Sequence, residues 1–376
     1  MKRVLIFSLA YYPRVGGAEV AIKEITDRTA DIEFEMITLR FGQESKVERV
    51  GKVLVHRVGF GGGYLSKILF VPLAAAEAYV LNRQQKFDAA WAMMSYMVFP
   101  IVLLRLLGVR LPYVLNLQDG DPFEQVFSRW YILPVRPLLV SGFRNAAVIQ
   151  PLSQYLVGWA KALGYLGPIE VIPNGASCKL FSEAVAHKRE AGDTILVSTS
   201  RLVYKNALDD VIRALKILPG VHFYNYGFGP DKSALLRLAQ QEGVEERVHL
   251  EPHPGVAHLP PYLKAADIFI RPSRTEGFGV SFIEAFAAGL PVIATQEGGI
   301  ADFLFDAKRN PDKPTTGWAV DKDSPTQIAE AVGEILGNPE GTRIVVETAK
   351  AMAFEKYDWD LIARDMRQRV FATLFR

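Results

Sequence analysis

Short apolar runs alternate with longer segments of helical periodicity along nearly the whole chain, and this alternation restricts the fold more than any other feature. In the first half, buried strands are expected at 4–10, 34–39, 89–93, 113–117 and 146–149, with an early helix over 18–30. Strands that alternate with helices form parallel sheets, because a helix must carry the chain back to the same edge. The first half is therefore predicted to be a doubly wound α/β domain.

The same alternation starts again after Pro173-Asn174-Gly175 breaks the periodicity. Strands are expected at 194–199, 221–226, 248–250, 268–271 and 291–294, and helices at 207–218, 232–242, from 281 onward and 326–336. We therefore predict an α/β protein with two doubly wound Rossmann-like domains, 1–172 and 173–358, that face each other across a cleft. Ligands of open parallel sheets bind beyond the carboxyl ends of the strands, so the active site is expected in that cleft.

Composition excludes several classes of protein. The chain has 376 residues, 49% of them hydrophobic, which suffices for full cores in two or three domains. Its 43 basic and 41 acidic residues leave a net charge of +2, which gives no indication of a nucleic acid partner. A single cysteine, Cys178, cannot form an internal disulfide, and no Cys and His spacing suggests a metal site. A cytoplasmic protein is predicted.

Apolar segments near the start of the chain are predicted to be internal elements. The run at 4–10 follows a basic start but stops too early for a signal peptide, and is expected to be a strand. The segments 68–81 and 97–109 are each interrupted by a charged residue and fall short of the ~18 apolar residues that a membrane span requires. Both are predicted to be helices packed on a sheet.

Two carboxylates, Glu276 and Glu284, flank a glycine-bearing turn and a helix start that follow the expected strand at 268–271. The unpaired N–H groups of a helix start favour phosphate, and glycine lets a ligand approach the main chain. Carboxylates accept hydrogen bonds from vicinal hydroxyls, so the pattern suits a nucleotide diphosphate sugar. The structural alternative is an ordinary helix N-terminus with acidic residues near its positive end.

A pair of cations, Arg201 and Lys205, follows the expected strand at 194–199. A guanidinium fork and an ammonium group can together neutralise the two charges of a pyrophosphate leaving group. Cations at the start of a helix are otherwise disfavoured unless an anion is present. We interpret the pair as a diphosphate site.

Two further candidates lie in the first half. Gly16 and Gly17 join the first strand to the first helix, where their amides can approach phosphates, although a plain tight turn has the same sequence. Gln118 and Asp119 follow the strand at 113–117 and are candidates for orienting a sugar or acceptor, or simply turn residues. Gln118 can donate and accept hydrogen bonds but cannot act as a general base.

The segment from Glu276 through Glu284 to Gly298-Gly299 resembles the donor site of retaining GT-B glycosyltransferases of family 4, the glycosyl transferases group 1. The resemblance implies that Glu276 faces the donor sugar and that Glu284 holds the ribose. It also implies that Arg201 and Lys205 bind the diphosphate, and that a tail helix over 359–376 crosses back to the first domain. It assigns donor contacts to the amides of Gly16, Gly17, Phe278, Gly279, Val280 and Ser281.

The chain departs from the family pattern at several positions. Ser200 and Asn206 replace glycines beside the cation pair, and Ser177 replaces an aspartate after Asn174-Gly175. Gln118 stands where many relatives have a histidine, which puts in doubt any mechanism with a base on that loop.

The resemblance implies a hexosyltransferase of polysaccharide biosynthesis that needs no metal or cofactor. Its donor would be a nucleotide diphosphate sugar, UDP-sugar ahead of GDP-sugar, and its acceptor a hydroxyl of a glycan or lipid-linked saccharide. Two alternatives stay open: a nucleotide-sugar 2-epimerase of the same fold, and an inactive partner subunit that binds donor without transfer. Segments 64–83 and 129–144 mix basic and apolar residues, which suits either core-facing helices or peripheral contact with the inner face of a membrane.

Overall fold

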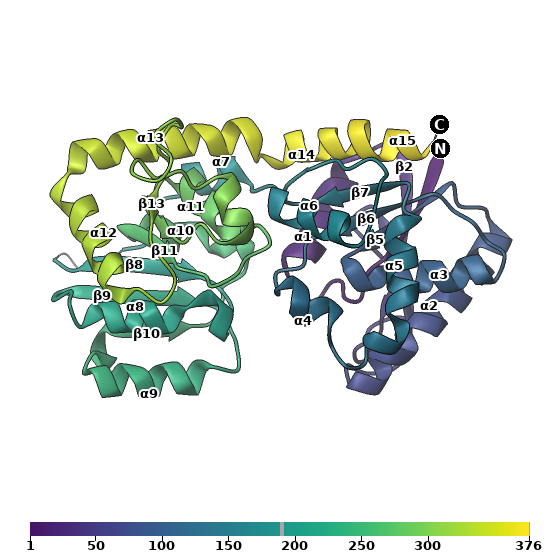
Figure 1. Cartoon of the computed structure of the whole chain (residues 1–376), viewed down its shortest axis with the longest axis horizontal. Coiled ribbons are helices and arrows are strands. Elements are labelled where there is room, and N and C mark those ends of the chain that lie inside the picture. The colour runs from purple at the N-terminus through teal and green to yellow at the C-terminus, as the bar shows by residue number, and fades with distance from the viewer. Residues whose placement is uncertain (189–191, 376) are drawn as a thin grey trace. The chain divides into compact units, whose positions relative to one another are not determined.

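The computed structural model describes residues 1–188 and 192–375, which form two compact units. Unit 1 comprises Met1–Asn174 with Trp359–Arg376, and unit 2 comprises Gly175–Asp358. Each unit has its own sheet with helices packed against it (Figure 1). The prediction of two doubly wound, Rossmann-like domains is therefore confirmed.

The sheet of unit 1 has seven strands in the order β3-β4-β2-β1-β5-β6-β7. The strands are β1 (Lys2–Phe7), β2 (Ile32–Leu39), β3 (Val47–Val50), β4 (Val53–Val58), β5 (Ala89–Met93), β6 (Tyr113–Leu117) and β7 (Val148–Pro151). All neighbours are parallel except β3, which runs antiparallel to β4 at the sheet edge. The sequence interpretation predicted a parallel sheet but missed this hairpin, which adds one antiparallel strand at the sheet edge. β3 is a short, polar edge strand with no buried residue, so it has no apolar run to reveal it.

The helical elements of unit 1 are α1 (Gly17–Arg28), α2 (Tyr64–Gln84), α3 (Val98–Leu106), α4 (Phe123–Phe127), α5 (Arg136–Arg144), α6 (Gln154–Ala162), α14 (Trp359–Asp365), a π-helical stretch (Met366–Phe371) and α15 (Ala372–Leu374). Two sets of these helices pack together: α3 contacts both α2 and α5, and α1 contacts α14.

By length and mean hydropathy (1.4), α2 could cross a membrane, but a core helix of a soluble protein meets the same criterion. Its contacts with β2 and α3 agree with the predicted helix packed on a sheet.

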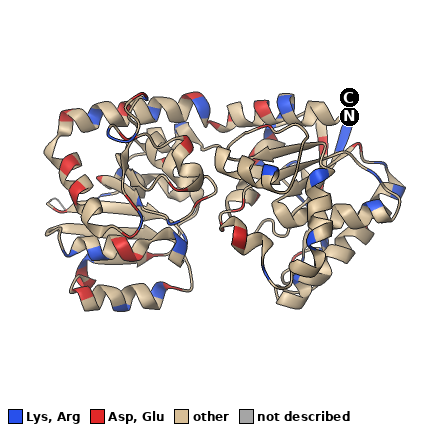
Figure 2. Cartoon of the chain, viewed as in Figure 1, with Lys and Arg blue, Asp and Glu red and all other residues tan. Residues whose placement is uncertain are grey.

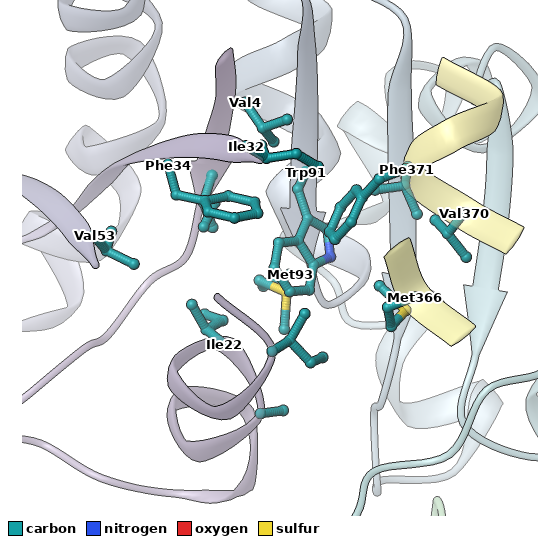
Figure 3. Close-up of a cluster of buried hydrophobic side chains, with 14 of the residues drawn as sticks. Val4, Ile22, Ile32, Phe34, Val53, Trp91, Met93, Met366, Val370 and Phe371 are labelled. Atoms are coloured by element: carbon teal, nitrogen blue, oxygen red, sulfur yellow. The ribbon is translucent and has the colours of Figure 1, made fainter. Parts of the chain in front are cut away.

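The C-terminal tail completes the core of unit 1. Phe371 is fully buried, and its ring lies 5.2 Å from that of Trp91 and 5.7 Å from that of Phe34 (Figure 3). Trp91 belongs to β5 and Phe34 to β2, so the tail packs against strands that are distant from it in sequence. Part of the stability of unit 1 must therefore come from the last residues of the chain.

Replacing Phe371 with alanine is expected to destabilise unit 1 by about 3 to 5 kcal/mol, because it leaves a cavity between two fixed rings. Thermal unfolding monitored by calorimetry should show the transition of unit 1 at a lower temperature. Phe354 of α13 is 39% exposed, so Phe354→Ala is a matched control with a small expected effect. Equal shifts in the two variants would contradict a structural role for the tail.

The sheet of unit 2 has six parallel strands in the order β10-β9-β8-β11-β12-β13. They are β8 (Thr194–Thr199), β9 (Val221–Tyr226), β10 (Val248–Glu251), β11 (Ile268–Arg271), β12 (Val292–Ala294) and β13 (Trp318–Ala319). From β8 the chain adds strands in one direction, and from β11 it adds them in the other. The switch point of unit 2, where ligands of such sheets bind, therefore lies between β8 and β11.

Two helix groups cover this sheet (Figure 1). α8 (Leu208–Leu215) packs with α9 (Lys232–Glu242) and α12 (Pro325–Gly337), while the second group consists of α7 (Cys178–Glu183), α10 (Pro260–Lys264), α11 (Val280–Ala288) and α13 (Pro339–Lys356). The sequence interpretation did not identify α13. Only Ala349, Met352 and Ala353 of this long helix are buried, so its apolar stripe is short.

Candidate functional site

The loops that follow β8 and β11 lie side by side at the switch point of unit 2. The predicted cations, Arg201 and Lys205, are on the first loop, and the predicted carboxylate Glu276 is on the second. Because β8 and β11 are neighbours, their carboxyl ends bring the two loops to the same edge of the sheet.

Glu276 is held at both of its carboxylate oxygens. Oε2 accepts a hydrogen bond from the guanidinium of Arg271 at 2.7 Å, and Oε1 accepts one from the backbone N–H of Gly277 at 3.0 Å. Arg271 is the last residue of β11 and is 6% exposed. The carboxylate therefore has a fixed orientation while retaining lone pairs for further hydrogen bonds.

The first turn of α11 leaves backbone amides without a side-chain cap. Gly279 precedes the helix with φ +91°, a left-handed conformation that favours glycine, and a Cβ there would meet Arg271 at 2.8 Å. The amides of Val280 and Ser281 begin the helix and suit an anion. The side chain of Phe278 is buried against Phe303, so only its main chain is suited to ligand contact.

Glu284 lies one turn further along α11. Burial raises its pKa to about 7, and the nearby charge of Arg271 opposes that rise. Its carboxyl also contributes to the raised pKa of Cys178, at the start of α7. Glu284 is thus a carboxyl group that changes its charge near neutral pH.

The loop after β8 carries Lys205 in a 3-10 turn (Tyr204–Asn206), and Arg201 is exposed. Arg274 ties this loop to the loop of Glu276. Its backbone N–H donates to the carbonyl oxygen of Lys205 at 2.7 Å, and its guanidinium donates to that of Tyr204 at 2.8 Å. The same guanidinium forms ion pairs with Asp209, Asp210 and Asp323. The two loops are therefore fixed relative to each other.

The glycine pair Gly298-Gly299, which follows β12, packs directly on the Glu276 loop. The N–H of Gly299 donates to the carbonyl oxygen of Glu276 at 2.9 Å. A Cβ at Gly298 would overlap that carbonyl oxygen, and one at Gly299 would overlap the carbonyl oxygen of Gly277. Glycine is required here because the two backbones approach too closely for any side chain.

The two candidate motifs of unit 1 lie at the ends of β1 and β6. Gly16, which precedes α1, and Gly17, its first residue, are both exposed, and the N–H of Gly16 donates to the carboxylate of Glu19 at 2.8 Å. Gln118 donates to Asn116 Oδ1 at 2.6 Å and accepts from Asn174 Nδ2 at 3.1 Å. The glycine turn is therefore open to a ligand, whereas Gln118 is held in place by its neighbours.

Asp119 is buried, in contrast to an ordinary turn residue. Its Oδ2 accepts hydrogen bonds from the hydroxyl of Ser95 at 2.8 Å and from the backbone N–H of Ser95 at 3.3 Å. Burial raises the pKa of this carboxyl. Its observed contacts join the loops after β5 and β6.

Sequence reasoning missed Arg271 and Arg274, the two arginines that fix the site. An arginine directly after three apolar strand residues, Ile268 to Ile270, was a signal of a buried charge that needs a partner. Nothing in the sequence indicated that Arg274 pairs with the distant Asp323.

A groove of about 730 Å³ lies elsewhere, between α5 and α6 of unit 1. It is lined by Leu133, Arg136, Pro137, Val140, Ser141, Arg144, Asn145, Ala162 and Leu163, none of which is a predicted site residue. Over residues 1–188 and 192–375, no cluster of three or more His, Cys, Asp or Glu side chains is placed to hold a metal ion.

Comparison with known proteins shows which proteins this chain resembles. Residues 182–352 match the family model of the glycosyl transferases group 1. A GDP-mannose-dependent alpha-(1-6)-phosphatidylinositol monomannoside mannosyltransferase of Mycolicibacterium smegmatis is 31% identical over 250 residues, or 61% of this chain. The chain spans 64% of that relative's length.

Solved structures share the whole fold. Sucrose-phosphate synthase of Thermosynechococcus elongatus superposes with a TM-score of 0.84 at 17% identity, covering 99% of this chain and 100% of that one. HepE of Anabaena, solved with UDP and glucose, gives a TM-score of 0.78 at 18% identity, with coverages of 99% and 100%. Residues 182–352 therefore resemble the glycosyl transferases group 1, and the whole chain has the two-domain GT-B fold of these solved structures.

Proposed function

We propose that this protein is a retaining glycosyltransferase that moves a sugar from a nucleotide diphosphate sugar to a hydroxyl of a glycan or lipid-linked acceptor. The observation that carries the proposal is the direct joining of two loops at the switch point of unit 2. Arg274 connects them by a 2.7 Å hydrogen bond to the carbonyl oxygen of Lys205. One loop supplies cations and the other supplies a carboxylate and a helix start.

In the proposed reaction, Arg201 and Lys205 stabilise the departing diphosphate. Arg201 is exposed, so its charge can reach an anion. The amides of Val280 and Ser281 add the positive end of α11. Stabilisation of the leaving group supplies most of the catalysis, with no covalent intermediate and no metal or other cofactor.

The remaining site residues hold the donor and acceptor. Glu276 accepts hydrogen bonds from the sugar hydroxyls and Glu284 from the ribose, while Phe278 and Gly279 contribute main-chain contacts. Gly16 and Gly17 of unit 1 approach the donor through their amides. Gln118 and Asp119 orient the sugar or the acceptor by hydrogen bonds alone.

We place GDP-mannose first among candidate donors. The sequence interpretation put uridine ahead of guanosine, but the relatives from Mycolicibacterium smegmatis and Corynebacterium glutamicum are both named GDP-mannose-dependent. Their names also include phosphatidylinositol mannosides, which supports a lipid-linked acceptor for this chain. The HepE structure contains UDP, but at 18% identity it supports the fold alone.

Incubation with GDP-mannose, UDP-glucose and related donors tests the proposal. Transfer to a lipid-linked saccharide, or slow donor hydrolysis without acceptor, is expected. Appearance of the 2-epimer would support the epimerase alternative, and donor binding without turnover would support an inactive partner subunit. Inverted configuration in the product would contradict the retaining mechanism.

We further propose that the cytoplasmic protein contacts the inner face of a membrane through α2 and its neighbours in unit 1. Large apolar side chains of α2 are exposed: Tyr64, Leu65, Ile68, Leu73 and Val80. Trp130, in the segment before α5, is 78% exposed. The segments 64–84, 94–118 and 128–150 carry seven Lys and Arg residues but only one carboxylate, Glu77. Their ribbons are accordingly mostly tan with blue patches (Figure 2). An exposed apolar surface with positive charge suits an anionic lipid surface.

Leu65→Glu is expected to weaken binding to vesicles of anionic phospholipid at least tenfold, since burying a leucine contributes roughly 1.5 to 3 kcal/mol. Co-sedimentation with vesicles measures the effect. Leu336→Glu, on an exposed leucine of α12 in unit 2, is the matched control and should bind as the unchanged protein does. Equal binding by both variants would exclude α2 as the contact surface.

A further inference from the structure

Arg271 is an unusual residue for the end of a buried strand. The preceding residues of β11, Ile268, Phe269 and Ile270, are all fully buried, and Arg271 itself is only 6% exposed. Taking a guanidinium out of water is costly unless its partners are well placed. Burial accordingly lowers the pKa of Arg271, while the charges of Glu276 and Glu284 oppose the change.

The guanidinium of Arg271 makes its contacts toward the candidate site. One terminal nitrogen donates to Glu276 Oε2 at 2.7 Å, and the other donates to the hydroxyl oxygen of Ser281 at 2.8 Å. The guanidinium carbon lies 4.3 Å from the ring centre of Phe282, a cation–π distance. Within the described part of the chain its buried Nε has no hydrogen-bond partner. The guanidinium also donates a longer hydrogen bond, at 3.5 Å, to the carbonyl oxygen of Thr199 at the end of β8. The side chain is therefore fixed by one carboxylate, one hydroxyl, one carbonyl oxygen and one aromatic face.

Stability of the fold does not explain a charge at this position. A buried ion pair contributes less to stability than well-packed apolar residues of similar volume in many proteins. The shortest hydrogen bond of Arg271 is the one to Glu276, at 2.7 Å, which points to a role in holding that carboxylate.

We propose that Arg271 is a positioning residue, which holds the Glu276 carboxylate in one orientation so that the donor sugar is recognised separately from the nucleotide. The inference rests on the proposed function of this site. With Oε2 fixed by Arg271 and Oε1 by the N–H of Gly277, the remaining lone pairs of both oxygens point to defined places. Two neighbouring hydroxyls of a sugar can then donate to one carboxylate without its reorientation.

Calorimetric titration with GDP and GDP-mannose, and with UDP and UDP-glucose, measures how the sugar changes affinity. The readout is the dissociation constant of the sugar nucleotide divided by that of the free nucleotide, for whichever of the two pairs the unchanged protein binds. With the titrations made well above pH 7, so that Glu284 stays ionised, we expect this ratio in Arg271→Met to shift at least tenfold against the sugar nucleotide, while affinity for the free nucleotide stays within about threefold. Arg271→Lys retains the positive charge but loses the planar guanidinium that bonds two partners at once, and should give an intermediate shift of the ratio.

A double variant separates positioning from a general structural role. Because Arg271 acts through Glu276, adding Arg271→Met to Glu276→Gln should produce no further shift of the ratio. Arg271→Lys keeps the test informative if Arg271→Met does not fold. An unchanged ratio, equal weakening of both ligands, or additive effects in the double variant would overturn the inference. If the unchanged protein binds no nucleotide at all, the proposed function itself fails.

Discussion

Lys205→Ala is expected to lower kcat for sugar transfer by about 10²- to 10³-fold, the usual effect of removing one group that stabilises charge in a transition state. The ammonium group would meet the diphosphate as the sugar bond breaks, so its loss should affect turnover more than donor affinity. Glu276→Gln, which preserves shape but removes the charge, is expected to cause a loss of the same order. Steady-state kinetics with saturating donor and acceptor measure both.

Lys216→Ala provides the matched control for charge. Lys216 lies on the same unit just after α8 and pairs on the surface with Glu242. Its removal changes the net charge by the same amount far from the reacting groups, so kcat should stay within about twofold. Turnover of Lys205→Ala equal to that of this control would count heavily against the assignment.

Glu284→Gln is expected to stabilise the folded protein at pH 8 while weakening nucleotide binding. The pKa of Glu284 is raised from 4.5 to about 7, so the folded state resists its ionisation. The resulting destabilisation is absent below pH 4.5, grows between pH 4.5 and 7, and is complete above pH 7. Glutamine removes it, which corresponds to roughly 3 kcal/mol of added stability at pH 8 and almost none at pH 4.5.

Unfolding in denaturant at the two pH values tests the stability effect. Glu251→Gln, at an exposed carboxylate on the end of β10, should leave stability unchanged at both. Nucleotide affinity of the unchanged protein should fall below pH 7 as Glu284 takes up a proton, and that pH dependence should be missing in Glu284→Gln. Arg271 is the charged group that acts on the pKa of this carboxyl, and Glu284 in turn contributes to the raised pKa of Cys178; neither Arg271 nor Cys178 is altered. Equal stability of the two proteins at pH 8 would refute the burial argument.

The sequence was sufficient to predict most strands of both sheets, though not β3, β4 or β13, and the loops that carry the candidate residues. Apolar runs such as those of β8 and β11 are covered on both faces, so their periodicity and their turn residues mark them clearly. Glu276, Gly279 and Glu284 were identified because residues of these types are close together in the sequence. Local patterns of this kind are visible without knowledge of the fold.

Features that depend on contacts between distant residues could not be predicted. The edge strand β3 is short and has no buried residue, and α13 buries few side chains. Arg274 is surrounded by carboxylates from α8 and from residue 323, and Phe371 packs on Trp91 from the other end of the chain. Such partners are brought together only by the tertiary structure.

The most direct test of the central claim is a calorimetric titration of GDP and UDP into the unchanged protein and into the double variant Arg201→Ala/Lys205→Ala. We expect the unchanged protein to bind one of these nucleotides at a single site. Each charge-assisted contact contributes roughly 1.5 to 3 kcal/mol, so the double variant should lose about a hundredfold or more in affinity. Binding of equal strength in both proteins, or no binding in either, would contradict a diphosphate site built from the loops after β8 and β11.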